Sequence, residues 1–135
     1  YNIDNQLEKD TTQELPLFTL QPIVENAFKH GVEPCIDGGN IIIRIRQYQE
    51  ELILTVVDNG VGMDKEQLEK MRLKTKIEEV RFNYEEHIGI ENVCSRLYML
   101  YEDRVHIFIS SRQGKGTIFT IRIKNANIHP ALENS

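Results

Sequence analysis

Four polar side chains crowd into the stretch QPIVENAFKHG, residues 21–31. They are Glu25, Asn26, Lys29 and His30, which supply a carboxylate, an amide, an ammonium group and an imidazole. At about 100° per residue of an α-helix, all four fall on one side and the apolar residues on the other. A local cation here could attract an anionic ligand in a chain whose net charge is −5. Taken alone, His30 is also explained as a structural residue at the helix end.

The stretch VVDNGVGM, residues 56–63, is a second candidate site. A strand ends at Asp58, and Gly60 and Gly62 follow at alternate positions. Glycines let the backbone turn sharply and let a flat ligand approach it closely. An isolated motif of this kind is also explained as a glycine-rich turn.

Glycines mark two further places. HIGIEN, residues 87–92, puts Gly89 before a helix, whose free N–H groups and positive end suit phosphate. GKGT, residues 114–117, is most simply a hairpin turn from which a strand starts at Thr117. Gly89 could equally serve only as a helix cap.

Apolar residues predict the helices that would position these groups. From Leu17 they recur at intervals of three and four, which predicts a helix that Gly31 ends as a residue just beyond the last turn. The same spacing predicts a helix over IGIENVCSRLYMLY, residues 88–101, with Gly89 near its start.

Alternating apolar residues predict two β-hairpins. The first joins NIIIRIRQ (40–47) to ELILTVVDN (51–59), and the second joins RVHIFISS (104–111) to TIFTIRIK (117–124). The side chains predicted to face inward are Ile41, Ile43, Ile45, Val105, Ile107, Ile109, Phe119, Ile121 and Ile123.

The segment from Asp64 to His87 is charged and mostly without a steady period. Asp64 with Gln67 three residues later predicts a capped short helix, and the rest predicts a mobile loop. Loops of this length in compact domains are often active-site lids, although a solvated surface is the alternative. Residues 126–135 are expected to be a frayed tail.

Composition limits the classes of protein to which the chain can belong. Its 135 residues fit one domain, with 40% hydrophobic and 27% charged residues and no apolar run near the roughly 20 residues of a membrane span. The acidic net charge argues against a nucleic-acid surface. Cys35 and Cys94 match no metal or disulfide spacing, which favours reduced thiols and an intracellular compartment.

Taken in order, QPIVENAFKHG, DNGVGM, HIGIENVCSRL and GKGTIFTIRI resemble the nucleotide-binding boxes of the ATP-binding domain of sensor histidine kinases. That domain belongs to the GHKL superfamily and shares its fold with gyrase, Hsp90 and the mismatch-repair ATPases. The wording LQPIVENAFKHG with IGIENVCSRL is most similar to the LytS/YesM branch. The resemblance covers about residues 15–124.

The resemblance implies a role for each candidate residue. Asn26 matches the ligand of Mg²⁺, Asp58 matches the carboxylate that binds the adenine amino group, and Thr117 assists it nearby. Lys29 and His30 match contacts to phosphate or ribose. The backbone positions implied around adenine and the phosphates are Gly60, Gly62, Met63, Gly89, Ile90 and Gly116.

Pro22 replaces a carboxylate that activates water in the relatives that hydrolyse ATP. Because proline has no acid–base chemistry, we expect slow hydrolysis and transfer of the γ-phosphoryl group to a nucleophile from elsewhere. Glu25, together with Asn26, remains the catalytic candidate, as a substitute base or as an orienter of the attacking histidine.

The chain departs from the family pattern in three ways. His87 stands where the second glycine box often has a glycine, and Phe82 is the only candidate for a phenylalanine box. No histidine stands in a phosphoacceptor context, so the substrate histidine would be on a segment absent from this chain. The cations that could contact phosphate from the lid are Arg72, Lys74, Lys76 and Arg81.

The predicted fold is α+β, a two-layer α/β sandwich of the Bergerat type. A mixed, mostly antiparallel sheet, with an added strand near residues 1–4, would be covered on one face by about three helices. Residues 1–125 would form the ATP-binding catalytic domain, with a lid at about 64–88 and a tail at 126–135.

The resemblance implies that the chain binds Mg-ATP and phosphorylates a histidine of a phosphoacceptor domain. The intact protein would be a membrane-anchored homodimer that acts on a response regulator. This part would be cytoplasmic, without membrane or nucleic-acid contact. Two alternatives on the same fold stay open: a serine kinase that acts as an anti-sigma factor, and a module that senses nucleotide without catalysis.

Overall fold

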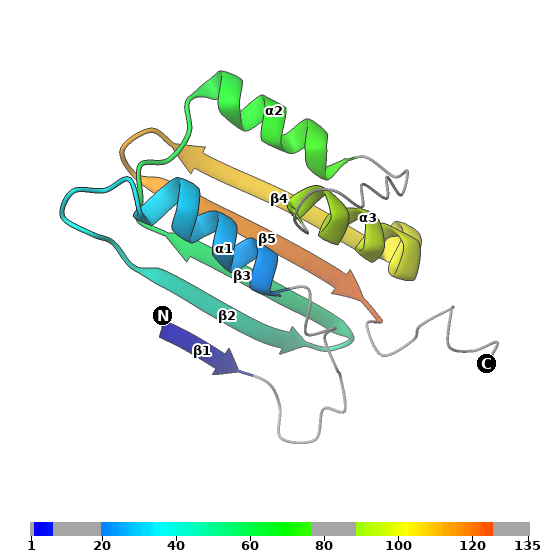
Figure 1. Ribbon diagram of the computed structural model, residues 1–135. Coiled ribbons are helices and arrows are strands. Elements are labelled where there is room, and N and C mark those ends of the chain that lie inside the picture. The colour runs from blue at the N-terminus through cyan, green and yellow to red at the C-terminus, as the bar shows by residue number, and fades with distance from the viewer. Residues whose placement is uncertain (1, 7–19, 77–88, 126–135) are drawn as a thin grey trace.

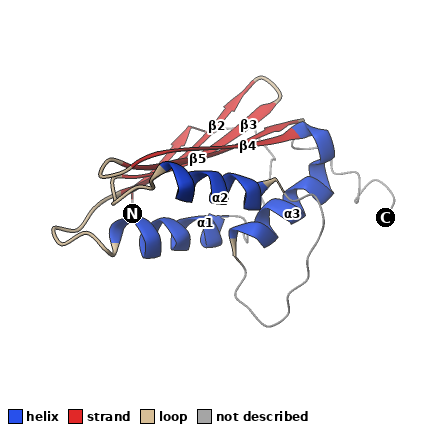
Figure 2. Ribbon diagram, turned by 90° about the horizontal axis from the view of Figure 1, so that it is seen from above, coloured by secondary structure: helices blue, strands red, loops and turns tan. Residues whose placement is uncertain are grey.

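A computed structural model of the protein describes residues 2–6, 20–76 and 89–125. They form two layers, with helices on one face of a single sheet (Figures 1 and 2). The five strands lie in the order β1-β2-β3-β5-β4, with β1 parallel to β2 and every other pair antiparallel. The predicted α+β sandwich, with its mostly antiparallel sheet and three α-helices on one face, is therefore confirmed.

Both predicted hairpins are present. The first consists of β2 (Ile41–Tyr48) and β3 (Glu51–Asp58), and the second of β4 (Val105–Arg112) and β5 (Gly116–Lys124). The added strand is β1 (Asn2–Gln6). The inward sets are buried or half-buried, as their alternation predicts.

Strand register places one polar row at the end of the sheet. Asp58 on β3 is paired with Thr117 on β5, and Thr117 is paired with Ser111 on β4. Each of these residues has the same parity as the buried residues of its strand. Their side chains therefore lie on the face that the helices cover.

The first helix differs from its prediction at its C-terminal end. α1 (Leu20–Asn26) continues directly as a π-helical segment, η1 (Ala27–Val32), in which the Glu33 amide donates to the Phe28 carbonyl. Gly31 is therefore inside the helix and buried, and the prediction that it ends the helix is wrong. The predicted start near Leu17 lies outside the described residues.

The π-helical turn also exposes a residue that the simple helical wheel would bury. Phe28 is 43% exposed, although a spacing of about 100° per residue assigns it to the apolar face of the helix. A π-helix has wider turns than an α-helix, so successive side chains rotate by less than the assumed 100°. The polar residues Glu25, Lys29 and His30 remain exposed.

The second helix is capped as predicted. α2 runs from Lys65 to Thr75. The Gln67 amide donates to Asp64 Oδ1 (2.8 Å), and the Asp64 amide donates to Gln67 Oε1 (3.0 Å). This reciprocal pair is a capping box. Of the predicted lid, residues 77–88 lie outside the described part, as does the predicted tail.

The third helix packs its apolar face against the sheet. α3 (Ile90–Tyr101) begins after Gly89 and buries Val93, Cys94, Leu97 and Tyr101 against the sheet core. Burial raises the pKa of the Cys94 thiol to about 12, so it stays protonated. Cys94 and Cys35 are both free, as predicted. Within the described ranges, no helix has the length and apolar character needed to cross a membrane.

Candidate functional site

A narrow crevice lies between the first helix and the end of the sheet that carries the polar row. Its volume is about 40 Å³. Polar groups enter it from the helix layer and from the strand ends, and apolar side chains form its walls. The residues that line it are Ile23, Asn26, Ala27, His30, Gly31, Val56, Asp58, Gly62, Met63, Met71, Thr117 and Phe119.

Asp58 is the buried carboxylate of this crevice. Its side chain is on the last residue of β3, is only 6% exposed, and accepts a hydrogen bond at Oδ1 from the Gly60 amide (2.9 Å). Burial raises the pKa of Asp58 above the ordinary value of 3.8, and the amides of Gly60 and Thr117 partly oppose that rise. Burial of a carboxylate is costly, so its position facing a crevice makes Asp58 a candidate for contact with a ligand.

Glycines allow the loop after β3 to contact the first helix. A Cβ atom on Gly31 would lie 2.7 Å from Asp58 Oδ1, and one on Gly60 would collide with the Gly31 carbonyl. The Val61 amide donates to that same carbonyl (3.0 Å). Because Gly31 and Gly60 have no Cβ atom, the backbone of the loop can approach the first helix closely beside the Asp58 carboxylate.

Thr117 is connected to the loop through Ser111. The two hydroxyl oxygens are 2.8 Å apart, and Ser111 Oγ also contacts the Met63 amide (2.8 Å) and the Gly116 carbonyl (2.9 Å). Sequence reasoning missed Ser111. The only available signal was its position opposite Thr117 across the second hairpin.

Two of the four polar helix residues line the crevice, and two do not. Asn26 and His30 reach it, and Asn26 makes no side-chain hydrogen bond with any described residue. Glu25 and Lys29 are exposed on neighbouring positions. Glu25 accepts a hydrogen bond from Gln21 Nε2 (3.1 Å).

Four backbone candidates lie outside the crevice lining. Gly60 and Gly116 are adjacent to lining residues, whereas Gly89 and Ile90 are at the start of α3. Gly89 acts as the N-cap of that helix, and its carbonyl accepts from the amides of Asn92 and Val93. Its capping role is therefore observed, and the phosphate role stays a prediction.

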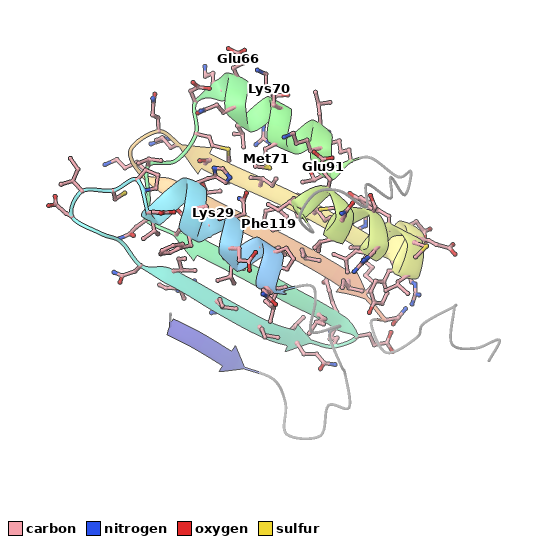
Figure 3. The ribbon with its side chains drawn as sticks, in the orientation of Figure 1. Lys29, Glu66, Lys70, Met71, Glu91 and Phe119 are labelled. Atoms are coloured by element: carbon pink, nitrogen blue, oxygen red, sulfur yellow. The ribbon has the colours of Figure 1, made fainter. Side chains whose placement is uncertain are left out.

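The sequence did not predict which apolar side chains would come together as the walls of the crevice. Met71 from α2 and Phe119 from β5, both labelled in Figure 3, line the crevice together with Val56 and Ile23. Phe119 and Val56 follow the inward alternation of their strands. Met71 lies three residues after the buried Leu68, which is the helical signal that could have indicated it.

Two of the predicted phosphate-contacting cations are engaged elsewhere. Arg72 donates from Nε and Nη2 to the Ile109 carbonyl on β4 (3.2 and 3.0 Å). Lys74 lies 3.8 Å from Glu91, linking α2 to α3. Residues Arg81, Phe82 and His87 lie outside the described part.

A sequence profile described as "Histidine kinase-, DNA gyrase B-, and HSP90-like ATPase" matches residues 13–127. An uncharacterized sensor-like histidine kinase of Staphylococcus epidermidis is 34% identical over 82% of this chain. The sensor protein kinase HptS of Staphylococcus aureus is 27% identical over 86% of it. In both cases the chain spans 21% of the relative, about a fifth of its length.

The fold is also found among solved structures. The histidine kinase domain of a blue-light activated histidine kinase from Erythrobacter litoralis EL346 superimposes with a TM-score of 0.58 and 18% identity, covering 93% of this chain and 54% of that one. A second structure of that kinase gives a TM-score of 0.54, with 36% of its chain covered. At this identity the similarity establishes the fold.

Proposed function

The chain belongs to the family of histidine kinase-, DNA gyrase B- and HSP90-like ATPases, and from this premise we propose that its crevice binds Mg-ATP as the catalytic domain of a two-component sensor histidine kinase. The observation that carries the proposal is Asp58, a buried carboxylate that lines the crevice beside Thr117. The wording LQPIVENAFKHG together with IGIENVCSRL favours the LytS/YesM-like branch.

The adenine ring fits the chemistry of the crevice walls. Asp58 supplies an acceptor for the exocyclic amino group, and Val56, Phe119, Met63 and Met71 supply apolar surfaces for a flat ring. The present volume is far below the roughly 300–1,000 Å³ of pockets that enclose a ligand. Entry therefore requires the walls to move, which flexible methionine side chains can do.

The phosphates would extend toward the exposed side of the first helix. Asn26 presents an amide oxygen to the crevice, and Mg²⁺ is commonly held by one or two protein oxygens together with substrate phosphates. His30 lines the same side, and exposed Lys29 supplies positive charge one turn from Glu25. We assign Gly62, Met63 and Gly116 with Gly60 to the adenine side, and Gly89 with Ile90 to the phosphate side.

The reaction would be transfer of the γ-phosphoryl group to an imidazole nitrogen of a phosphoacceptor domain. A phosphorus–nitrogen bond forms, the bond to the bridging oxygen breaks, ADP leaves, and a base accepts the imidazole proton. Exposed Glu25 would act as that base or would orient the histidine. Pro22 is buried in the first turn of α1 and has no group that could activate water, so hydrolysis should be slow.

The remaining assignments concern the intact protein. We propose that it is a membrane-anchored homodimer in which this domain is cytoplasmic, and that a response regulator accepts the phosphoryl group. The chain spans only about a fifth of its curated relatives, so the signal-receiving part would lie in other segments.

Phosphoryl transfer tests this function. The chain is mixed with radiolabelled ATP, Mg²⁺ and a purified phosphoacceptor domain of a sensor histidine kinase, with Asn26→Ala as the inactive comparison. Label that is stable to base and labile to acid, and absent with Asn26→Ala, is expected. Acid-stable label on serine would indicate the anti-sigma type of kinase, and ATP binding without any transfer would indicate a sensing module.

A further inference from the structure

Ser111 has three hydrogen-bond partners but only one proton to donate. Its Oγ lies 2.8 Å from the Met63 amide, 2.9 Å from the Gly116 carbonyl and 2.8 Å from Thr117 Oγ1. An amide nitrogen only donates, so Ser111 accepts from Met63. A carbonyl only accepts, so Ser111 gives its proton to Gly116.

The direction of the third hydrogen bond follows from this count. Because the Ser111 proton is committed to Gly116, the hydroxyl of Thr117 must donate to Ser111 Oγ. Thr117 lines the crevice, whereas Ser111 is not among the lining residues. Thr117 therefore presents only lone pairs to a ligand, with its own proton directed away from the crevice.

Two acceptors thus line the same part of the crevice. Asp58 is the direct cross-strand partner of Thr117, and ionised carboxylates only accept. Side chains of such a pair lie close together on one face of a sheet. A ligand group placed against both must donate, and an oxo group there would find no donor from either side chain.

We propose that Ser111 is a positioning residue for nucleotide selectivity: by fixing the Thr117 hydroxyl as an acceptor, it makes the crevice favour a purine with an exocyclic amino group over one with an oxo group. This inference rests on the proposed binding of ATP. It adds a residue outside the crevice that controls which purine is accepted.

The test compares the affinities for ATP and inosine triphosphate, which carries an oxo group where ATP has the amino group. The native chain is expected to prefer ATP. In Ser111→Ala, the Thr117 hydroxyl is free to rotate and donate to the oxo group. The dissociation constant of inosine triphosphate divided by that of ATP should therefore fall by about fivefold, which corresponds to one ordinary hydrogen bond.

Three further variants control for damage to the fold. Ser110→Ala changes the exposed neighbour of Ser111 and should leave the ratio unchanged. Ser111→Thr keeps a hydroxyl and should restore the native ratio. If Ser111→Ala does not fold, Ser111→Cys tests the same point, because a thiol forms only weak hydrogen bonds, and a smaller fall in the ratio is expected.

The outcomes separate this inference from the function on which it rests. A native chain that prefers ATP, with an unchanged ratio in Ser111→Ala and Ser111→Cys, would overturn the role of Ser111 and leave ATP binding intact. A native chain that binds no ATP would overturn both. A lower ratio in Ser111→Ala, with the native ratio in Ser111→Thr, supports the proposal. A merely structural defect would weaken the binding of both nucleotides to the same extent.

Discussion

Asp58 is held in a buried position by a few specific contacts. The amides of Gly60 and Thr117 favour its charged form, but burial outweighs them and raises the pKa of the carboxyl. The raised pKa means that the folded state disfavours the ionised form of Asp58. At neutral pH, Asp58 therefore contributes less to the free energy of unfolding than a neutral side chain of the same shape would. Stability therefore does not explain its position, whereas the proposed role in binding ATP would.

Asp58→Asn should stabilise the fold at neutral pH while it removes ATP binding. The asparagine oxygen can still accept from the Gly60 amide, and no charge is buried. The raised pKa means that the Asp58 penalty develops as pH rises from the unfolded value of 3.8 through the folded value. Thermal unfolding should show a higher Tm for Asp58→Asn near pH 7 and a smaller difference at low pH; a Tm below that of the native chain at pH 7 would contradict this.

The affinity for ATP should weaken on acidification at a pH above that expected for an exposed aspartate. The ionised carboxylate accepts more strongly from the adenine amino group than the protonated carboxyl does. Burial raises the pKa of Asp58 in the free protein. Binding should therefore strengthen as pH rises through that pKa and then level off. Titrations across pH measure this, with Asp64, an exposed carboxylate outside the crevice, replaced by Asn as the control. A profile in Asp58→Asn identical to the native profile would exclude Asp58 as the titrating group.

Helices and strands were predictable where a local pattern decides them. The hairpins follow from alternation, and α2 follows from Asp64 and Gln67, which form the predicted capping box. The π-helical segment was not predictable, because Gly31 is buried there against Asp58, which is distant in sequence. Residues such as Ser111 and Met71 join the site only through packing between elements, which one sequence does not reveal.

Asp64→Ala should destabilise α2 more than the rest of the fold. It removes the side-chain half of the capping box, and loss of an N-cap typically costs about 1 kcal/mol. Hydrogen exchange should become faster in the amides of Lys65–Thr75, while those of α3 change less. Lys65→Ala, at an adjacent exposed position, is the matched control. Equal exchange in α2 for Asp64→Ala and the control would rule out a stabilising cap.

At the scale of the whole molecule, one core joins the helix layer to the sheet. α3 contributes Val93, Cys94 and Leu97, and strands β3 and β5 contribute Leu54 and Ile121, all at most 1% exposed. The crevice borders this core: Ile23, Val56 and Phe119 belong to both, whereas Leu97 and the other α3 residues do not line the crevice. The core can therefore be weakened without altering a residue that touches the ligand.

Leu97→Ala should reduce the free energy of unfolding by about 2–5 kcal/mol, because it leaves a cavity at a position with 0% exposure. Met99→Ala on the same helix is the control, since Met99 is 57% exposed and a change within about 0.5 kcal/mol is expected. Denaturant unfolding measures both. Folded Leu97→Ala should still bind ATP, and a cost no larger than that of Met99→Ala would contradict the assigned core.

The central claim is that the crevice binds Mg-ATP through Asp58 and Asn26, and calorimetric titration with ATP, with and without Mg²⁺, tests it most directly. The native chain should bind ATP more tightly with Mg²⁺. Asp58→Ala should lose binding, and Asn26→Ala should bind ATP without the Mg²⁺ effect. Glu33→Ala, at an exposed position after η1, should behave as the native chain. No binding by the native chain, or unchanged binding in both Asp58→Ala and Asn26→Ala, would contradict the claim.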